Sequence, residues 1–370
     1  MEIKFNVKAR ETLQHLTPYT PGKPIWELQA ELGLPNIIKL ASNENPLGPS
    51  PRALDAIAGS LHDLHRYPDA STSRLRQSLA AKLELSPDQF IISNGGDELI
   101  TLLSETFLET GDEVIICTPS FSEYEFGAHL MGATVVQVPL GENFQFDIDA
   151  IVGAVNELTK LLCLCSPNNP TGTYLPRGIL HHLLDVLPKH IVVLMDAAYS
   201  QFATASDYTD GLEFVRAGYP VIVLQTFSKL YGLAGIRVGY GAAPETIIRQ
   251  IAKVKEPFNV NALAQAAAAA ALYDTEHVRL TLEANNRGKL QLYQGFQELG
   301  LSCVESMSNF VLVDIGPDAK RVYETLLARG IIVRFGGIWN LPHYLRISVG
   351  TREENAALLK EIASIMNQAE

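Results

Sequence analysis

The most informative stretch of the chain reads Thr226-Phe227-Ser228-Lys229-Leu230-Tyr231-Gly232-Leu233-Ala234-Gly235-Ile236-Arg237-Val238-Gly239-Tyr240. The run before it, Pro220 to Gln225, is short, continuous and rich in β-branched side chains, which indicates a buried strand. Lys229 therefore lies just past the end of a strand. An amine held away from bulk solvent loses part of its preference for the charged form. This suits a lysine that attacks a carbonyl and forms a Schiff base.

Arg237 follows the lysine by eight positions and offers a planar guanidinium, which is fit to bind a phosphate. Hydroxyl side chains flank the lysine at Thr226 and Ser228. Together, a Schiff-base lysine, hydroxyls and an arginine suggest pyridoxal phosphate. The alternative is a surface lysine in a glycine-rich loop, and an isolated Ser-Lys pair would favour that alternative. The rest of the chain decides between the two.

Length and composition describe an ordinary globular protein that can bury a large core. The chain has 370 residues, which is more typical of two domains than of one, with 47% hydrophobic and 19% charged residues. Its formal net charge of -12 argues against a general surface for nucleic acid or anionic membranes. Any phosphate site must therefore be local.

The cysteines and the first residues indicate a reducing compartment. Cys117, Cys163, Cys165 and Cys303 have neither metal-ligand nor disulfide-framework spacing, so we expect reduced thiols and no metal site. The chain begins without an apolar signal segment, and it has no uncharged run long enough to span a bilayer. We therefore expect a cytoplasmic protein.

From Ser71 onward helical and strand patterns alternate, which implies an α/β fold with a mostly parallel sheet covered on both faces. The expected strands are Phe90 to Ser93, Glu113 to Cys117, Thr134 to Val138, Leu161 to Cys165, Ile191 to Met195, Val221 to Gln225 and a short one at Arg237 to Gly241. Ligands of such sheets bind beyond the carboxyl ends of the strands. Polar or glycine-rich residues at these ends are therefore candidate ligand contacts.

Five clusters follow these strands. They are Asn94 to Glu98 with the Gly95-Gly96 pair, Thr118 to Tyr124 with Phe121, Ser166 to Gly172 with Asn168 and Asn169, Asp196 to Tyr199, and the Lys229 loop. Glycines before a helix let a phosphate approach free N–H groups, although the pair could be a plain turn. Phe121 could stack on a flat cofactor or belong to the core. An aspartate ending an apolar strand needs a charged partner, and a protonated pyridine nitrogen would be one.

The expected domain organisation has an N-terminal arm at 1–42, a large domain at 43–265 and a small C-terminal domain at 266–370. Prolines break up regular structure in the arm. An alanine-rich helix, Asn261 to Tyr273, leads into a second long helix, Thr275 to Leu299, and residues 300–314 read as one strand. Arg334 and Arg346 each follow apolar strand-like residues, so each is expected to face an anion, either a substrate or an internal carboxylate.

With these residues in hand, the chain resembles the fold-type I, pyridoxal-phosphate-dependent aminotransferases, and among them the histidinol-phosphate aminotransferase family. The resemblance runs almost end to end. It is carried by Ser42-Asn43-Glu44-Asn45-Pro46, Ser166-Pro167-Asn168-Asn169-Pro170-Thr171-Gly172, Asp196 to Tyr199, Thr226 to Lys229 with Arg237, and Leu345-Arg346-Ile347. It implies a mostly parallel seven-stranded sheet between helices, a smaller α/β domain, and a homodimer with shared active sites.

The resemblance also implies residue roles. The catalytic residues would be Lys229, which holds the cofactor and moves protons, Asp196, which keeps the pyridine nitrogen protonated, and Tyr199, which with Asn169 binds the phenolic oxygen. Phe121 would stack on the ring. The phosphate would be bound by Gly96, Asp97, Ser228, Arg237 and, from a second subunit, Tyr67, and Thr226 would also contact the cofactor. Tyr19, Asn43, Arg334 and Arg346 would contact substrate.

Two departures from the family pattern are Ala197-Ala198, where Glu-Ala is usual, and Leu47, where tyrosine is common. Neither removes a cofactor contact. The family implies transamination between L-histidinol phosphate and 2-oxoglutarate, which yields glutamate, in histidine biosynthesis. Trp339, in the loop before Arg346, leaves a preference for aromatic amino acids open. A third alternative is decarboxylation of threonine phosphate, which the Ser42 to Pro46 motif resembles less.

Overall fold

The computed structural model describes residues 7–16 and 23–367. Its helices are α1 (Ile25–Leu32), α2 (Pro51–Ser60), α3 (Ser73–Leu83), α4 (Gly96–Phe107), α5 (Glu123–Met131), α6 (Ile148–Ala154), α7 (Arg177–Val186), α8 (Leu212–Arg216), α9 (Glu245–Ile251), α10 (Ala262–Ala271), α11 (Thr275–Glu298), α12 (Ala319–Ala328) and α13 (Arg352–Met366). Its strands are β1 (Ile38–Lys39), β2 (Phe90–Ser93), β3 (Glu113–Thr118), β4 (Thr134–Pro139), β5 (Thr159–Cys165), β6 (Val192–Asp196), β7 (Val221–Thr226), β8 (Gly239–Ala242), β9 (Ser302–Val304), β10 (Phe310–Asp314), β11 (Ile331–Ile332), β12 (Arg334–Phe335) and β13 (Tyr344–Ser348). Within the described ranges, no helix combines the length and apolar character that crossing a bilayer requires.

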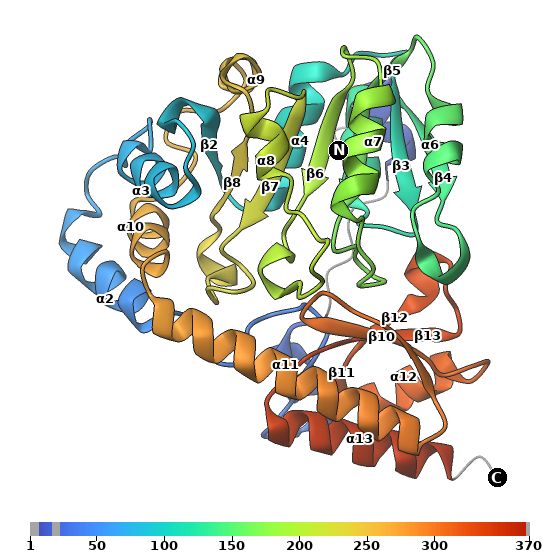
Figure 1. Ribbon diagram of the computed structural model, residues 1–370. Helices are drawn as coiled ribbons and strands as arrows, with labels where there is room; N and C mark the ends of the chain where they lie inside the picture. Colours follow the sequence, from blue (N-terminus) through green and yellow to red (C-terminus); the bar gives the residue numbers. More distant parts are fainter. Residues whose placement is uncertain (1–6, 17–22, 368–370) are drawn as a thin grey trace, which may run out of the picture.

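The largest sheet has seven strands in the order β2-β8-β7-β6-β5-β3-β4 (Figure 1). Strand β8 is antiparallel to both β2 and β7, and the other neighbouring pairs are parallel. The prediction of a mostly parallel seven-stranded sheet is therefore confirmed. Because the parallel strands point the same way, the residues that follow them meet at one edge.

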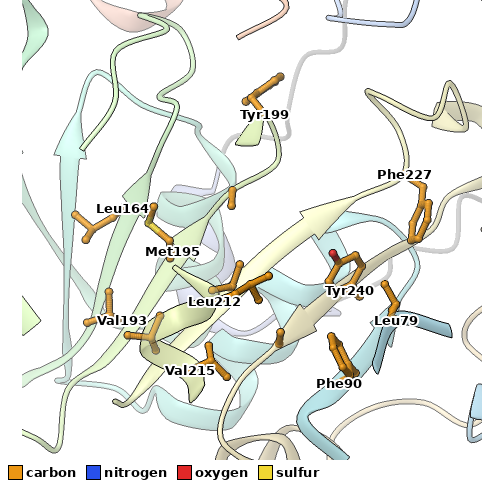
Figure 2. Close-up of a cluster of buried hydrophobic side chains, with 14 of the residues drawn as sticks. Leu79, Phe90, Leu164, Val193, Met195, Tyr199, Leu212, Val215, Phe227 and Tyr240 are labelled. Carbon is orange, nitrogen blue, oxygen red and sulfur yellow. The ribbon is translucent and has the colours of Figure 1, made fainter. Parts of the chain in front are cut away.

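Two hydrophobic clusters cover the two faces of this sheet, which explains why its strands are continuous apolar runs. In β6, Val193 and Met195 belong to one buried cluster, whereas Leu194 between them belongs to the other. Figure 2 shows Val193 and Met195 beside Leu212 and Val215 of α8. Successive side chains of a strand point to opposite faces, so only a sheet covered on both sides buries every residue of β6.

A second, antiparallel sheet follows in the C-terminal part of the chain, in the order β12-β13-β10-β9. Helices α11, α12 and α13 pack with it around a third hydrophobic cluster (Figure 1). The single strand expected at residues 300–314 is wrong, because the structure has β9 and β10 paired antiparallel, with residues 305–309 connecting them. Those connecting residues turn toward the large sheet, where Met307 N–H donates to the Gly172 carbonyl over 2.8 Å.

Two contacts tie the expected units together. Strand β1, near the end of the N-terminal arm, pairs in parallel with β11 of the C-terminal part. Helix α10 packs against α2 and α3, and Ala267, Ala268 and Ala271 belong to the same buried cluster as the large sheet. The expected boundary after residue 265 thus falls inside a helix that covers the large sheet. The next turn, at Asp274, separates α10 from α11.

Candidate active site

A cavity of about 240 Å³ lies at the carboxyl edge of the large sheet, where the C-terminal part approaches it. The sequence-predicted site residues that line it are Asn43, Gly96, Asp97, Phe121, Asn169, Asp196, Tyr199, Thr226, Ser228, Lys229, Arg237, Arg334 and Arg346. Strand register explains part of this convergence, since Cys165 at the end of β5 pairs with Asp196 at the end of β6. Tyr67 does not line the cavity, and Tyr19 lies outside the described residues.

The loop after β7 holds Lys229 at the cavity. Its neighbours Phe227 and Leu230 are buried and anchor the loop, whose ends are closed by hydrogen bonds from Phe227 N to Val238 O and from Leu233 N to Phe227 O. The Lys229 amine donates to the Ser42 carbonyl over 3.0 Å. Burial, with a smaller contribution from the Arg346 charge, lowers the pKa of Lys229 to about 8. This amine is therefore a far better nucleophile at neutral pH than an exposed lysine.

Asp196 ends β6 and is buried. One oxygen, Oδ2, accepts a hydrogen bond from the Tyr124 hydroxyl over 2.5 Å, and the other, Oδ1, accepts from Ala198 N–H over 3.0 Å. Burial nonetheless raises the pKa of Asp196 to about 6. A cationic N–H bound opposite this carboxyl would stabilise its charged form. Tyr124 ends the predicted Thr118 to Tyr124 cluster, but the sequence pattern assigns it no role, because no local signal connects it to a residue as far along the chain as Asp196.

Helix α4 offers an anion site at its N-terminus. Gly95 precedes the helix with a φ of 87°, and a Cβ there would lie 2.5 Å from Arg237 Nη2. Only glycine therefore allows Arg237 to approach this turn so closely. Arg237 donates to Asp97 over 3.3 Å, and the hydroxyls of Thr226 and Ser228 lie 2.9 Å apart. Free N–H groups, a positive dipole end, hydroxyls and a guanidinium together suit a phosphate.

A hydrogen-bond network crosses from the C-terminal sheet to Tyr199. Asn43 has a φ of 55° and donates from Nδ2 to the Tyr199 hydroxyl over 3.0 Å. Its backbone N–H donates to Ser348 Oγ, which in turn donates to Asn43 Oδ1, and its carbonyl accepts from Asn309 Nδ2. Ser348 and Asn309 therefore hold Asn43 in place. The sequence pattern gives neither residue a role, since Asn309 falls within the strand expected at 300–314 and Ser348 directly follows the Leu345-Arg346-Ile347 motif.

Arg346, on β13, is buried and held on several sides. Its guanidinium donates to Asn169 Oδ1 and, over 2.5 Å, to the Ala41 carbonyl. Its Cζ lies 5.3 Å from the ring centroid of Phe310 and 5.1 Å from that of Trp339. Arg334, on the neighbouring strand β12, is its register partner, so two arginines reach the cavity side by side.

Tyr67 lies on the surface, with 83% of its area exposed. Its ring stacks on that of Phe258, with centroids 4.8 Å apart. Phe258 is itself exposed and has a φ of 61°. Within one chain, therefore, Tyr67 has no contact with the cavity.

The cavity residues fit pyridoxal phosphate. An anion site at α4, a buried carboxyl at Asp196 and a lysine of lowered pKa lie around one cavity, with Phe121 and Ala198 among its apolar lining. These groups match the phosphate, the ring nitrogen, the carbonyl and the flat ring of that cofactor.

Comparison with known proteins gives consistent matches. The family model described as aminotransferase class I and II matches residues 35–362. The chain is 46% identical to histidinol-phosphate aminotransferase of Moorella thermoacetica over 97% of this chain and 93% of the relative. It is 44% identical to histidinol-phosphate aminotransferase 2 of Carboxydothermus hydrogenoformans, over 97% and 99%. Among solved structures, histidinol-phosphate aminotransferase of Sinorhizobium meliloti in complex with pyridoxal-5'-phosphate is similar with a TM-score of 0.91, 26% identity and 99% of both chains covered.

Proposed function

The chain belongs to the class I and II aminotransferase family, and we propose that it transfers an amino group between L-histidinol phosphate and 2-oxoglutarate, producing imidazole acetol phosphate and glutamate. This is the reaction of histidinol-phosphate transaminase (EC 2.6.1.9) in histidine biosynthesis. The observation that carries the proposal is the near-full-length identity to relatives of that name, combined with a cavity built for pyridoxal 5'-phosphate.

When bound, the cofactor supplies a ring that accepts the negative charge developing at the substrate α-carbon. We assign Lys229 to holding the cofactor and to moving the proton at that carbon. Asp196 would keep the ring nitrogen protonated, and Asn169 and Tyr199 would hydrogen-bond the phenolic oxygen. Phe121 packs against the ring. The phosphate is assigned to N–H groups of Gly96 and Asp97, the side chains of Thr226, Ser228 and Arg237, and Tyr67 of a second subunit.

The two arginines support the choice of substrate. Histidinol phosphate has no carboxylate, so its phosphate must occupy the anion site that the α-carboxylate of glutamate uses in the other half-reaction. A phosphate carries more oxygens and more charge than a carboxylate, which suits two guanidinium groups better than one. Arg346 and Arg334, on paired strands, both line the cavity. Trp339 is not among the lining residues, so its side chain offers no support for an aromatic substrate.

We further propose a homodimer with shared active sites, because Tyr67 is exposed in one chain and its assigned phosphate lies in another.

A cytoplasmic location is supported by the cysteines, since Cys117, Cys163, Cys165 and Cys303 are all free thiols. For the domains, we propose an arm at 1–42, a large domain at 43–265 and a small C-terminal domain at 266–370. Helix α10 spans the boundary between the last two, and its buried alanines pack with the large sheet.

Substrate assays test the proposal directly. The purified protein, loaded with pyridoxal phosphate, should have a higher kcat/KM for histidinol phosphate than for phenylalanine, tyrosine or threonine phosphate, with 2-oxoglutarate as acceptor. A native preference for phenylalanine would establish an aromatic aminotransferase instead. Release of carbon dioxide from threonine phosphate would establish a decarboxylase.

A further inference from the structure

Tyr124 lies directly behind the Asp196 carboxyl and outside the cavity lining. Its side chain is only 2% exposed, and its hydroxyl donates to Asp196 Oδ2 over 2.5 Å. A phenol has a single O–H donor, so this hydrogen bond commits the Tyr124 proton to Asp196. A short bond of this kind to a carboxylate is among the stronger hydrogen bonds in proteins.

The surroundings of Asp196 balance opposing effects on its charge. Burial disfavours the carboxylate, and the charge of Asp97 on α4 acts in the same direction. Lys229 and the two donors, Tyr124 and Ala198 N–H, favour it. The titratable groups Cys163, Cys165, Tyr199 and Tyr208 also sense the Asp196 charge, and burial raises the pKa of each, so that all four stay protonated. Of the two donors, only the Tyr124 hydroxyl can be removed without disturbing the backbone.

We propose that Tyr124 is a positioning residue that keeps the negative charge on Asp196 and thereby keeps the proton on the ring nitrogen of the bound cofactor. One proton is shared between the ring nitrogen and the Asp196 carboxyl. It lies either on the ring nitrogen, facing a carboxylate, or on Asp196, facing a neutral ring. The Tyr124 hydrogen bond stabilises the first arrangement because it is strongest when the acceptor is ionised. The inference rests on the cofactor assignment made above and extends it to a residue outside the cavity.

Tyr124, which supports Asp196, and Phe121, which is assigned to the cofactor ring, lie on one short segment of the chain. Phe121 lines the cavity, and three residues later Tyr124 lies in the first turn of α5. Their rings meet edge to face, with centroids 5.7 Å apart. A shift of α5 would therefore move both the side chain assigned to the cofactor ring and the donor assigned to Asp196.

The test compares Tyr124→Phe with a matched control, Tyr240→Phe. Tyr240 is also buried, and its hydroxyl donates over 2.6 Å, but to the uncharged Gln225 Oε1 and away from the cavity. Each holoenzyme is loaded with cofactor labelled at the ring nitrogen, and nitrogen NMR reports protonation without any substrate. We expect a protonated ring nitrogen in the native protein and in Tyr240→Phe, and partial or complete loss of that proton in Tyr124→Phe. The kcat of Tyr124→Phe should fall about ten- to a hundredfold, with little change in the KM for glutamate.

Two further arms separate this role from a packing effect. With a cofactor analogue that carries carbon in place of the ring nitrogen, Tyr124→Phe should cost no additional activity. In an Asp196→Asn background, it should likewise have no further effect on kcat. A ring nitrogen that stays protonated in Tyr124→Phe, or a loss of kcat that persists with the analogue, would overturn the proposal. Because the NMR signal needs no amino donor, an error in the substrate assignment would leave this result unchanged.

Discussion

The guanidinium of Arg346 lies against the indole of Trp339, with Cζ 5.1 Å from the ring centroid. Phe310 approaches the same guanidinium at 5.3 Å. A side chain that the sequence left open as a contact for aromatic substrates thus supports the arginine assigned to the substrate's anionic group. Aromatic contacts of this kind restrict where a guanidinium can point while leaving its N–H groups available for hydrogen bonds.

Replacing Trp339 should therefore weaken anion binding in general. We expect Trp339→Leu to raise the KM for both glutamate and histidinol phosphate by roughly two- to thirtyfold, the cost of losing one cation–π contact. Steady-state kinetics with both substrates provides the measurement. Trp26→Leu is the control, because Trp26 is largely exposed on α1 and is not part of the cavity. Selective loss of activity toward phenylalanine would mean that Trp339 touches the substrate itself.

The two arginines should differ in what they recognise. Arg334→Ala is expected to lower the kcat/KM for histidinol phosphate more than that for glutamate, whereas Arg346→Ala should lower both. The reason is that only the phosphate is large enough to contact both guanidinium groups. Each lost charge-assisted contact should lower kcat/KM by about one to two powers of ten. Ratios of kcat/KM for the two substrates give the answer. Equal losses for both substrates in Arg334→Ala would contradict the assignment.

Lys229 should carry the cofactor covalently. Borohydride treatment of the holoenzyme should fix the cofactor irreversibly to this lysine, and peptide mapping by mass spectrometry should recover the label there. Lys289 provides an internal comparison, since its pKa is also lowered to about 8 by burial, but it donates to the Ser306 carbonyl rather than into the cavity. A label on any lysine other than Lys229 refutes the assignment.

The amine of Lys229 should react at unusually low pH after the cofactor is removed. Its pKa in the folded chain is about 8, below the ordinary value of about 10.4, so the neutral, nucleophilic form accumulates as pH rises through 8. Acylation followed by mass spectrometry should show this midpoint, against a model lysine peptide as reference. Because the Arg346 charge is the second cause of the lowering, Arg346→Ala should move the midpoint upward. A midpoint near that of the reference peptide would contradict the lowered pKa of Lys229.

Complementation between subunits tests the shared site. Tyr67→Phe chains and Lys229→Ala chains should each have low activity alone, and mixing them should restore it, because some hybrid sites then contain both native residues. Tyr273→Phe, another exposed tyrosine, is the control and should behave as the native chain. Sedimentation velocity gives the state of association. A fully active monomer would be incompatible with the proposal.

The sequence by itself was enough for the large sheet and for the cluster of residues at its edge. Continuous apolar runs can be read as strands buried on both faces, and parallel strands bring their carboxyl ends together whatever else the chain does. Asp196, Asn169 and Lys229 each follow such a run, and all three line one cavity. Their convergence is a consequence of local pattern combined with a general rule of α/β folds.

Tertiary structure alone decided which side chains support that cluster. The Tyr124 hydroxyl meets Asp196 across 72 positions of the chain, and Ser348 meets Asn43 across 305. Trp339 stands beside Arg346 rather than in the cavity, and α10 joins the large sheet rather than the C-terminal part. These contacts depend on how whole elements pack against one another, and packing is determined by the shape and volume of many side chains at once. The periodicity of a single segment therefore cannot predict this packing.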